Sequence, residues 1–133
     1  MTSVSSNIVS IAELSNIPVL DRPMLNQIKS IDDNEHKLLK ELFGMFENDM
    51  PIRLSALKTA IESNDMTKVR ELSHAAKGSC GAIGAVRTRA ISAMIEVYSK
   101  CGQADATPGE LFDRLQNAFD EACEALRKYI EGG

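Results

Sequence analysis

The chain has 133 residues and a formal net charge of −4 at pH 7, a length that suits one domain with a modest core. Apolar residues make up 44% of the sequence but aromatic residues only 5%, and there is no Trp. Aliphatic side chains must therefore fill the interior, which favours helices over a β-sandwich. The acidic balance gives no electrostatic footprint for nucleic acid, and no stretch of about 18 consecutive apolar residues predicts a membrane span.

The cysteines indicate a reducing compartment. Cys80, Cys101 and Cys123 are widely spaced and contain no CxxC pair, so they predict neither a disulfide framework nor a zinc site. Cys80 is interpreted as a small packing residue and not as a redox switch. The residues up to Leu14 lack the charged and apolar regions of a signal peptide. We therefore expect a soluble, cytoplasmic protein with reduced thiols.

The N-terminal residues have no regular pattern. Residues 1–17 are rich in Ser, Asn and Val, and we expect a partly ordered arm that precedes a domain over residues 18–131. In that domain, Asp21-Arg22-Pro23 is a helix-start signal, with an acidic N-cap residue and an early proline. Three apolar residues then give a short amphipathic capping helix: Met24, Leu25 and Ile28.

A long apolar stripe predicts the next helix, from about residue 33 to 63. Its members recur in steps of three and four residues, as one face of a helix requires: Leu39, Phe43, Phe46, Met50, Leu54, Leu57 and Ile61. Pro51 lies inside this stretch, and proline normally ends or kinks a helix. Because the stripe passes Pro51 in register, we predict a single kinked helix.

Asp65 can cap a third helix, which is predicted to run to about Ala82. Its narrow inward stripe is expected to be Val69, Leu72, Ala76, Ser79 and Ile83. The opposite face would then gather basic residues and glycines: Arg70, His74, Lys77, Gly78 and Gly81. Gly78 costs a helix interior roughly 1 kcal/mol relative to alanine, so we expect the close approach of another surface to offset it.

Two further helices complete the domain. Gly84-Ala85 turns the chain into a fourth helix, whose inward residues are expected to be Ala90, Ile91, Met94, Val97 or Tyr98, and Cys101. After a loop over residues 102–106, Thr107 to Glu110 combine an N-cap threonine, an early proline and a capping-box glutamate. The last helix ends at Gly132 and turns inward Phe112, Leu115, Phe119, Ala122, Leu126 and Tyr129. The short links predict an all-α fold, an antiparallel up-down-up-down four-helix bundle with a short extra N-terminal helix.

His74 is the strongest candidate for chemistry. Imidazole is nucleophilic near neutral pH and can hold a phosphoryl group on one ring nitrogen as a labile phosphoramidate. Lys77 and Gly78 follow at i+3 and i+4 and share its helix face. An ammonium group and a notch without a side chain would thus lie beside the imidazole, as in a site that handles phosphate.

The sequence lacks the other parts of a phosphoryl-transfer enzyme. Such chemistry generally needs a metal held by carboxylates together with positioned cations, and Glu71 is the one acid that can lie on the His74 face. There is also no P-loop and no kinase glycine loop. We therefore predict that the chain has no kinase activity of its own, binds no cofactor or metal, and relies on a partner for the missing groups.

The run from His74 to Ala85, HAAKGSCGAIGA, resembles the signature of histidine-containing phosphotransfer (HPt) domains, commonly written HxLKGSxxxxGA. The likeness covers about residues 18–130 and extends to Val19-Leu20-Asp21, Phe46 and Ile95-Glu96. Three residues depart from the usual Leu, Leu and Cys and predict a slightly thinner core near the site: Ala76, Thr88 and Ser92.

The resemblance implies a phosphorelay intermediary of two-component signalling. His74 would accept a phosphoryl group on Nε2 from the Asp of one receiver domain and pass it to another, while Lys77 neutralises phosphoryl charge. Arg70, Gly78 and Gly81 would form the docking face. The expected partners are the receiver domains of a hybrid histidine kinase and of a response regulator, which would bring Mg²⁺. The chain itself is expected to be a monomer, with no nucleic-acid or membrane partner.

Two other classes of function are weighed against this one. A helical adaptor that docks on a receiver domain without accepting phosphate would need no nucleophile, so the combination of His74, Lys77 and Gly78 argues against it. A metal or thiol enzyme in the bundle core could use a Glu-x-x-His pair such as Glu71 and His74. That pair is predicted to face water and lacks further inward carboxylates. The second histidine, His36, is interpreted as a surface residue.

Overall fold

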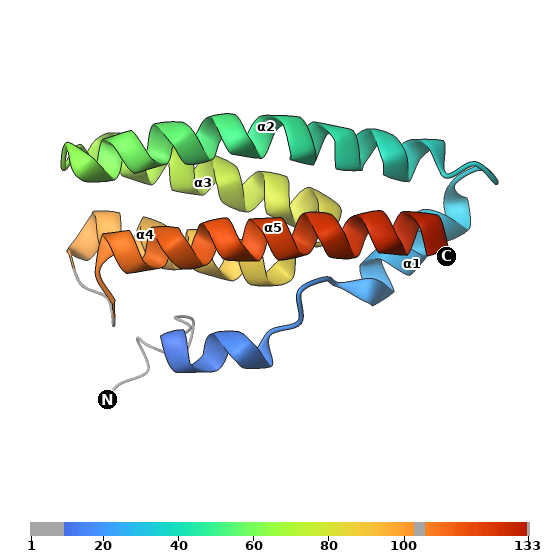
Figure 1. Cartoon of the computed structure of the whole chain (residues 1–133), viewed down its shortest axis with the longest axis horizontal. Coiled ribbons are helices and arrows are strands. Elements are labelled where there is room, and N and C mark those ends of the chain that lie inside the picture. The colour runs from blue at the N-terminus through green and yellow to red at the C-terminus, as the bar shows by residue number, and fades with distance from the viewer. Residues whose placement is uncertain (1–9, 103–105, 133) are drawn as a thin grey trace.

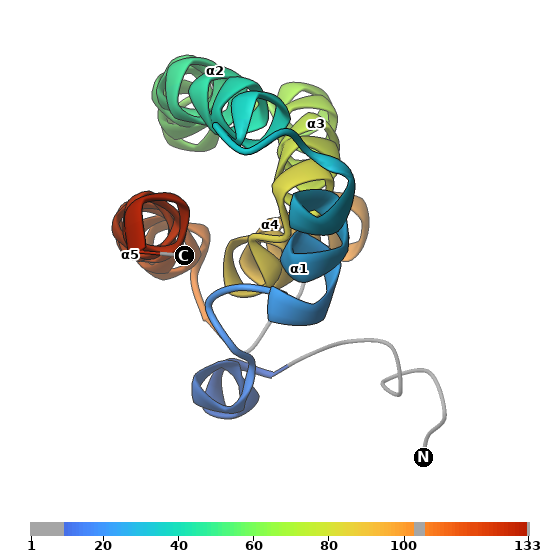
Figure 2. The same cartoon turned by 90° about the vertical axis from the view of Figure 1, so that its right-hand side faces the viewer.

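The computed structural model describes residues 10–102 and 106–132, and every regular element in these ranges is helical. The elements are the 3-10 helix η2 (Ile11–Asn16) and the α-helices α1 (Arg22–Ile31), α2 (Lys37–Glu62), α3 (Met66–Ile83), α4 (Val86–Cys101) and α5 (Pro108–Gly132). From α2 onward each helix packs against the next, and α5 packs back against α2. Figure 1 shows the bundle from the side and Figure 2 from one end, where α3 and α5 lie diagonally opposite each other. The predicted bundle is confirmed; positions 103–105 of the predicted loop lie outside the described residues.

Helix starts that the sequence predicts are confirmed by side-chain hydrogen bonds. The Asp21 carboxylate accepts from the Met24 N–H at 3.1 Å, and the Asp65 carboxylate accepts from the Lys68 N–H at 3.2 Å. At the start of α5, Thr107 and Glu110 bond reciprocally: the threonine hydroxyl accepts one backbone N–H at 3.1 Å, and the glutamate accepts the other at 3.0 Å. These bonds satisfy N–H groups that the helices leave unpaired.

The start of α2 differs from the prediction, because the helix begins at Lys37 and not near residue 33. The Asp32 carboxylate accepts backbone N–H bonds from the first turn at 3.0 and 2.9 Å and so caps α2 from the preceding loop. His36 adopts φ +57°, a left-handed conformation that excludes it from the helix, and it is half-buried where a surface position was expected. Pro51 lies inside one continuous helix.

The buried stripe of α3 also differs. Its fully buried members are Val69, Ser73, Ala76, Cys80 and Ile83, whereas Leu72 and Ser79 are only half-buried. Ser73 can enter the core because its hydroxyl donates to the Val69 carbonyl at 2.7 Å, so no polar group is left unsatisfied. The rotation of α3 that results turns His74 away from the position opposite the core and towards α4.

Two small polar residues of α4 are buried in the bundle. Thr88 and Ser92 are fully buried, and the Ser92 hydroxyl donates to the Thr88 carbonyl at 3.0 Å. Cys80 is fully buried, and burial raises the pKa of its thiol to about 12, which agrees with a packing role.

Cys101, predicted to face inward, is exposed because it is the final residue of α4. Several predicted core residues lie half-buried at its edge: Phe43, Ile61, Ala90, Val97, Tyr98 and Phe112.

The segment before α1 is fastened to the bundle. Within the expected arm, residues 11–16 form η2, and Leu14 is buried in the core. The Arg87 guanidinium donates from Nε to the Ile17 carbonyl at 2.8 Å, which ties this segment to the start of α4. Residues 1–9 of the arm lie outside the described residues. Across the described ranges, no helix combines the length and apolar character needed to span a membrane.

Candidate functional site

His74 projects from the middle of α3, with 71% of its side chain exposed. Its ring nitrogen Nδ1 lies 3.0 Å from Oε2 of Glu96 on α4. An ionised carboxylate can only accept a hydrogen bond, so Nδ1 carries the proton in this contact. The other nitrogen of the neutral ring, Nε2, then keeps its lone pair. The geometry thus leaves one nucleophilic nitrogen on an exposed side chain.

Glu96 is the buried centre of this cluster, with 8% of its side chain exposed. Besides His74, it binds Lys77, whose Nζ lies 2.7 Å from Oε1, and Lys100, whose Nζ lies 3.7 Å from Oε2. Burial alone would raise the pKa of Glu96, but the hydrogen bonds from Lys77 and His74 and the charges of the two lysines outweigh burial and lower this pKa. The carboxylate therefore stays ionised at neutral pH and can balance positive charge on the imidazole.

Glu96 is absent from the predicted site, which assigned the His74 face no acid other than Glu71. The omission follows from the rotation of α3, since a histidine at the boundary with α4 meets a side chain from that helix. One signal in the sequence could have identified it. Ile95-Glu96 matches the HPt pattern, and Ile95 is fully buried, so the next residue lies at the edge of the core.

The glycines of the predicted docking face have different surroundings. A Cβ at Gly78 would meet no atom within 4 Å, so this position is open. A Cβ at Gly81 would lie 3.6 Å from Nε of Arg89, because the arginine side chain covers that glycine. Arg70 is exposed one turn before His74. The structure therefore places an open notch beside His74 at Gly78 but not at Gly81.

Two arginines flank the second half of α3. From α2, the half-buried Arg53 donates from Nη1 to the Ser79 hydroxyl at 2.6 Å. From α4, the exposed Arg89 lies over Gly81. Neither guanidinium has a carboxylate within ion-pair distance among residues 10–102 and 106–132.

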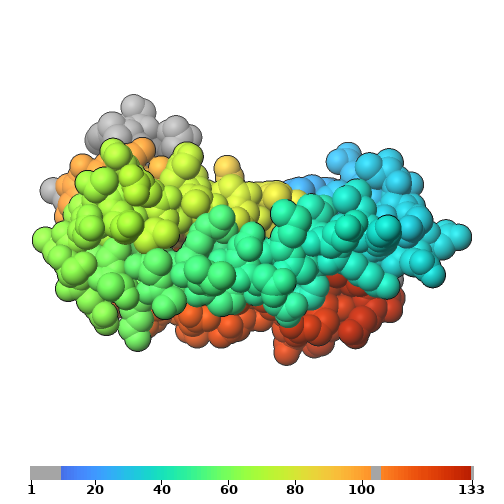
Figure 3. All heavy atoms as spheres, turned by 90° about the horizontal axis from the view of Figure 1, so that it is seen from above, coloured from blue at the N-terminus to red at the C-terminus, as the bar shows by residue number. Residues whose placement is uncertain are grey.

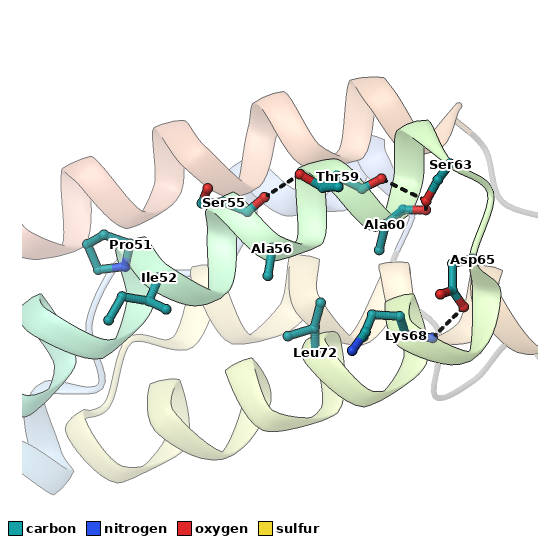
Figure 4. Close-up of a pocket in the computed structure, with 10 residues that line it drawn as sticks. All are labelled: Pro51, Ile52, Ser55, Ala56, Thr59, Ala60, Ser63, Asp65, Lys68 and Leu72. Carbon is teal, nitrogen blue, oxygen red and sulfur yellow. Dashed lines mark hydrogen bonds between the residues drawn. The ribbon is translucent and has the colours of Figure 1, made fainter.

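An apolar groove runs between α2 and α3. Figure 4 shows Ile52 and Ala56 of α2 and Leu72 of α3 directed towards the space between the two helices. Met45 and Leu38 continue the line of Ile52 along α2 at intervals of seven residues, which keeps them on one face. The exposed fractions are 72% for Ile52, 61% for Met45 and 40% for Leu38. Figure 3 looks onto this side, with α2 in front and the second half of α3, in yellow, behind it.

Comparisons with known proteins identify one family. The family model of the Hpt domain matches residues 41–129. Multistep phosphorelay regulator 1 of Schizosaccharomyces pombe is 25% identical over 88 residues, which cover 65% of this chain and 30% of that protein, so the chain spans less than a third of the length of this curated relative.

Solved structures share the fold. The histidine-containing phosphotransfer domain of ArcB from Escherichia coli superposes with a TM-score of 0.75 at 23% identity, over 86% of this chain and 94% of that one. Histidine-containing phosphotransfer protein B (HptB) from Pseudomonas aeruginosa PAO1 gives a TM-score of 0.73 at 22% identity, over 87% and 97% of the two chains.

Proposed function

Because the chain belongs to the Hpt domain family, we propose that it is a phosphorelay intermediary in two-component signalling, with His74 as the phosphoacceptor. His74 receives the phosphoryl group from the aspartyl phosphate of one receiver domain and passes it to the Asp of another. The observation that carries this proposal is the contact of Nδ1 with Glu96 at 3.0 Å, which leaves Nε2 as the nucleophile on an exposed ring.

The transfer step follows from this arrangement. Nε2 of His74 attacks the phosphorus atom of the aspartyl phosphate, an Nε2–P bond forms, and the P–O bond to the aspartate breaks. The aspartate leaves as a carboxylate with the bonding electron pair. Nδ1 keeps its proton, so the phosphorylated ring carries a positive charge, and the ionised Glu96 stabilises it through their hydrogen bond. Transfer to the second receiver domain reverses these bond changes.

Lys77 has a role in both states of His74. In the structure its ammonium lies 2.7 Å from Oε1 of Glu96 and keeps that carboxylate ionised and oriented. An ammonium group has three donor hydrogens, so Lys77 can donate to an oxygen of a phosphoryl group on Nε2 and still bind Glu96. We propose that Lys77 stabilises the charge that develops on the phosphoryl oxygens in the transition state.

The docking face of the proposal includes the α2–α3 side of the bundle. Next to the open notch at Gly78, Ser79 binds Arg53 of α2, and α2 also carries the exposed apolar line with Ile52 and Met45. An exposed apolar line that adjoins a polar site is typical of a protein interaction surface. We propose that the receiver domain covers this line when its acceptor Asp reaches His74.

The metal and the acceptor carboxylate belong to the receiver domain in this proposal. Glu96 is the carboxylate that contacts His74 within the described part of the chain, and it already binds nitrogen atoms of three side chains. Its oxygen atoms are thus already engaged by two lysine ammonium groups and by the Nδ1–H of His74. This chain supplies the nucleophile, its orientation and one stabilising ammonium group.

The test is phosphorylation by a receiver domain. The purified chain is incubated with a phosphorylated receiver domain and Mg²⁺, and acid-labile, alkali-stable phosphate is measured on wild type, His74→Gln and His36→Gln. We expect label on wild type and His36→Gln only, with unchanged thermal unfolding of His74→Gln because the side chain is exposed. Label that persists on His74→Gln would contradict the assignment. Binding of the receiver domain without any label would favour the adaptor.

A further inference from the structure

Arg53 holds its guanidinium at the edge of the proposed docking face. Its Nη1 donates to the Ser79 hydroxyl, and Ser79 is the neighbour of the open Gly78. An arginine has five donor N–H groups in a fixed plane, and this bond uses one of them. The half-buried side chain is therefore oriented by the protein while most of its donors lack a charged acceptor.

Arg89 occupies the corresponding place on the other flank of α3. Its Nε and Cδ lie 3.6 and 3.7 Å from the position that a Cβ of Gly81 would take, so the absence of a side chain at Gly81 gives the arginine room to lie on α3. Burial raises the pKa of the Cys80 thiol, and the positive charges of Arg53 and Arg89 act in the opposite direction. Both guanidinium groups therefore lie near Cys80 in the second half of α3. The two guanidinium groups thus straddle α3.

The position of the two arginines brings them within reach of anything that docks on His74. Ser79 and Gly81 follow His74 by five and seven residues, which is about 8 and 10 Å along the axis of a helix. A standard protein interface covers about 800 Å² on each partner, a patch roughly 30 Å across. Around the helix, Gly81 lies about 20° and Ser79 about 140° from His74. A partner centred on His74 and Gly78 therefore covers Arg89 directly and reaches Arg53 where it also covers the α2–α3 side.

Contacts that orient the side chains distinguish Arg53 and Arg89 from the other basic residues without an ion pair. Acidic residues outnumber basic ones by 19 to 15, yet neither Arg53 nor Arg89 has an acidic partner in the described ranges. By contrast, Lys77 and Lys100 are both engaged by Glu96. Arg70 is also unpaired, but no contact orients its side chain. Beside the docking face, Arg53 and Arg89 are therefore the unpaired cations that the protein itself orients.

We propose that Arg53 and Arg89 form a carboxylate-binding pair that orients the docked receiver domain through acidic side chains on its surface. This inference rests on the proposed function, and it assigns the two arginines to docking and not to the transfer step. Planar guanidinium groups suit this role because they bind carboxylates through two parallel hydrogen bonds. Two such anchors on opposite flanks of α3 define the rotation of the partner about His74, which a single contact cannot do.

The test compares transfer from a panel of phosphorylated receiver domains with labelling by phosphoramidate, a small donor that needs no docking. The variants are Arg53→Gln, Arg89→Gln and the double variant, with Arg114→Gln on the diagonally opposite α5 as the control for loss of one charge. We expect the double variant to lower the second-order rate constant of transfer about tenfold or more at low ionic strength and to weaken its salt dependence. Labelling by phosphoramidate and the first-order rate in the saturated complex should match wild type.

Further measurements separate docking from structure. Ser79→Ala removes the hydrogen bond of Arg53 but keeps its charge, so it should preserve most of the salt-dependent transfer. If Ser79→Ala reproduces both the transfer defect and the melting temperature of Arg53→Gln, Arg53 is a clamp between helices and the proposal fails. It also fails if the double variant transfers like Arg114→Gln. Calorimetric titration with unphosphorylated receiver domains measures the binding affinity of the same variants in the absence of transfer. If the wild type binds a receiver domain but takes no label, the proposed function is contradicted, whereas the role of the two arginines in docking can still be tested by this titration.

Discussion

Nδ1 of His74 lies 3.0 Å from Oε2 of Glu96, and this contact between neighbouring helices places the proton on Nδ1 and leaves the lone pair on Nε2 of an exposed ring. A free histidine side chain exchanges its proton between the two nitrogens. A buried acceptor that fixes the tautomer and orientation of an imidazole raises its basicity as well. In the proposed transfer Glu96 is therefore a positioning residue, since it would act on the phosphoryl group through His74.

Replacement of Glu96 should separate orientation from charge. Glu96→Gln keeps an acceptor for Nδ1–H but loses the negative charge, whereas Glu96→Ala loses both. We expect labelling of His74 by phosphoramidate to fall severalfold in Glu96→Gln and about tenfold to a hundredfold in Glu96→Ala, by analogy with residues that orient metal-binding histidines. Nitrogen NMR of the imidazole reports the tautomer directly. An unchanged Nδ1–H population in Glu96→Ala would contradict this role.

The lowered pKa of Glu96 predicts a specific pH dependence of stability. Because its pKa is lower in the folded state than the ordinary value of about 4.3, its charged contacts contribute fully above about pH 5 and are lost as the pH falls through the folded pKa. We expect Glu96→Gln to be about 1 kcal/mol less stable at neutral pH, with a difference that shrinks in acid.

Urea unfolding of both proteins from neutral pH into acid measures this difference. Asp32 and Glu110 also have lowered pKa values, through hydrogen bonds from the backbone, but they are the same in both proteins and cancel in the comparison. A stability difference that is constant in acid would show that the charge of Glu96 contributes nothing.

The elements that local chemistry determines could be predicted from the sequence. Asp65 and Thr107 begin their helices where the cap patterns place them, since a cap requires only residues within one turn. The start of α2 could not be predicted in this way, because the left-handed conformation of His36 follows from how Asp32 meets the first turn. Periodicity alone does not anticipate that arrangement.

The residues of the site also divide into those that local sequence predicts and those that depend on tertiary structure. His74, Lys77 and Gly78 lie on one helix, and their spacing indicates a shared face before any tertiary structure is known. Glu96 lies on another helix, and its approach depends on the rotation of α3 about its axis. That rotation is set by the burial of Ser73, a small polar residue that hydropathy assigns to the surface, so the acid at the centre of the site was not predicted.

The apolar line on α2 should contribute to docking and not to folding. Ile52 is 72% exposed, so Ile52→Lys should change the free energy of unfolding by no more than about 0.5 kcal/mol. We expect it to weaken binding of a receiver domain about tenfold or more, because a charged group would replace an apolar contact at the interface. Ile31→Lys on α1, where the side chain is 79% exposed, is the matched control. Equal effects of the two variants on binding would place the docking face elsewhere.

Gly78 should show opposite effects on stability and function. A Cβ there meets no atom within 4 Å, so Gly78→Ala should stabilise the helix by up to about 1 kcal/mol. Gly78→Gln should also keep or raise the melting temperature, while its longer side chain fills the notch beside His74 and obstructs the receiver domain. Labelling by phosphoramidate should persist in Gly78→Gln, whereas binding and transfer with a receiver domain should both fall.

Two other variants serve as comparisons for Gly78→Gln. Gly84 adopts φ +71°, so Gly84→Ala should lower stability by about 1 kcal/mol through backbone strain and shows that a glycine substitution in this region can be destabilising. Lys77→Ala should slow transfer within the bound complex and leave receiver binding nearly unchanged, because its charge acts on the transition state. If Gly78→Gln and Lys77→Ala gave the same profile of binding and transfer, the notch and the ammonium group would not have separate roles. Transfer by Gly78→Gln at the wild-type rate would show that the open position has no part in docking.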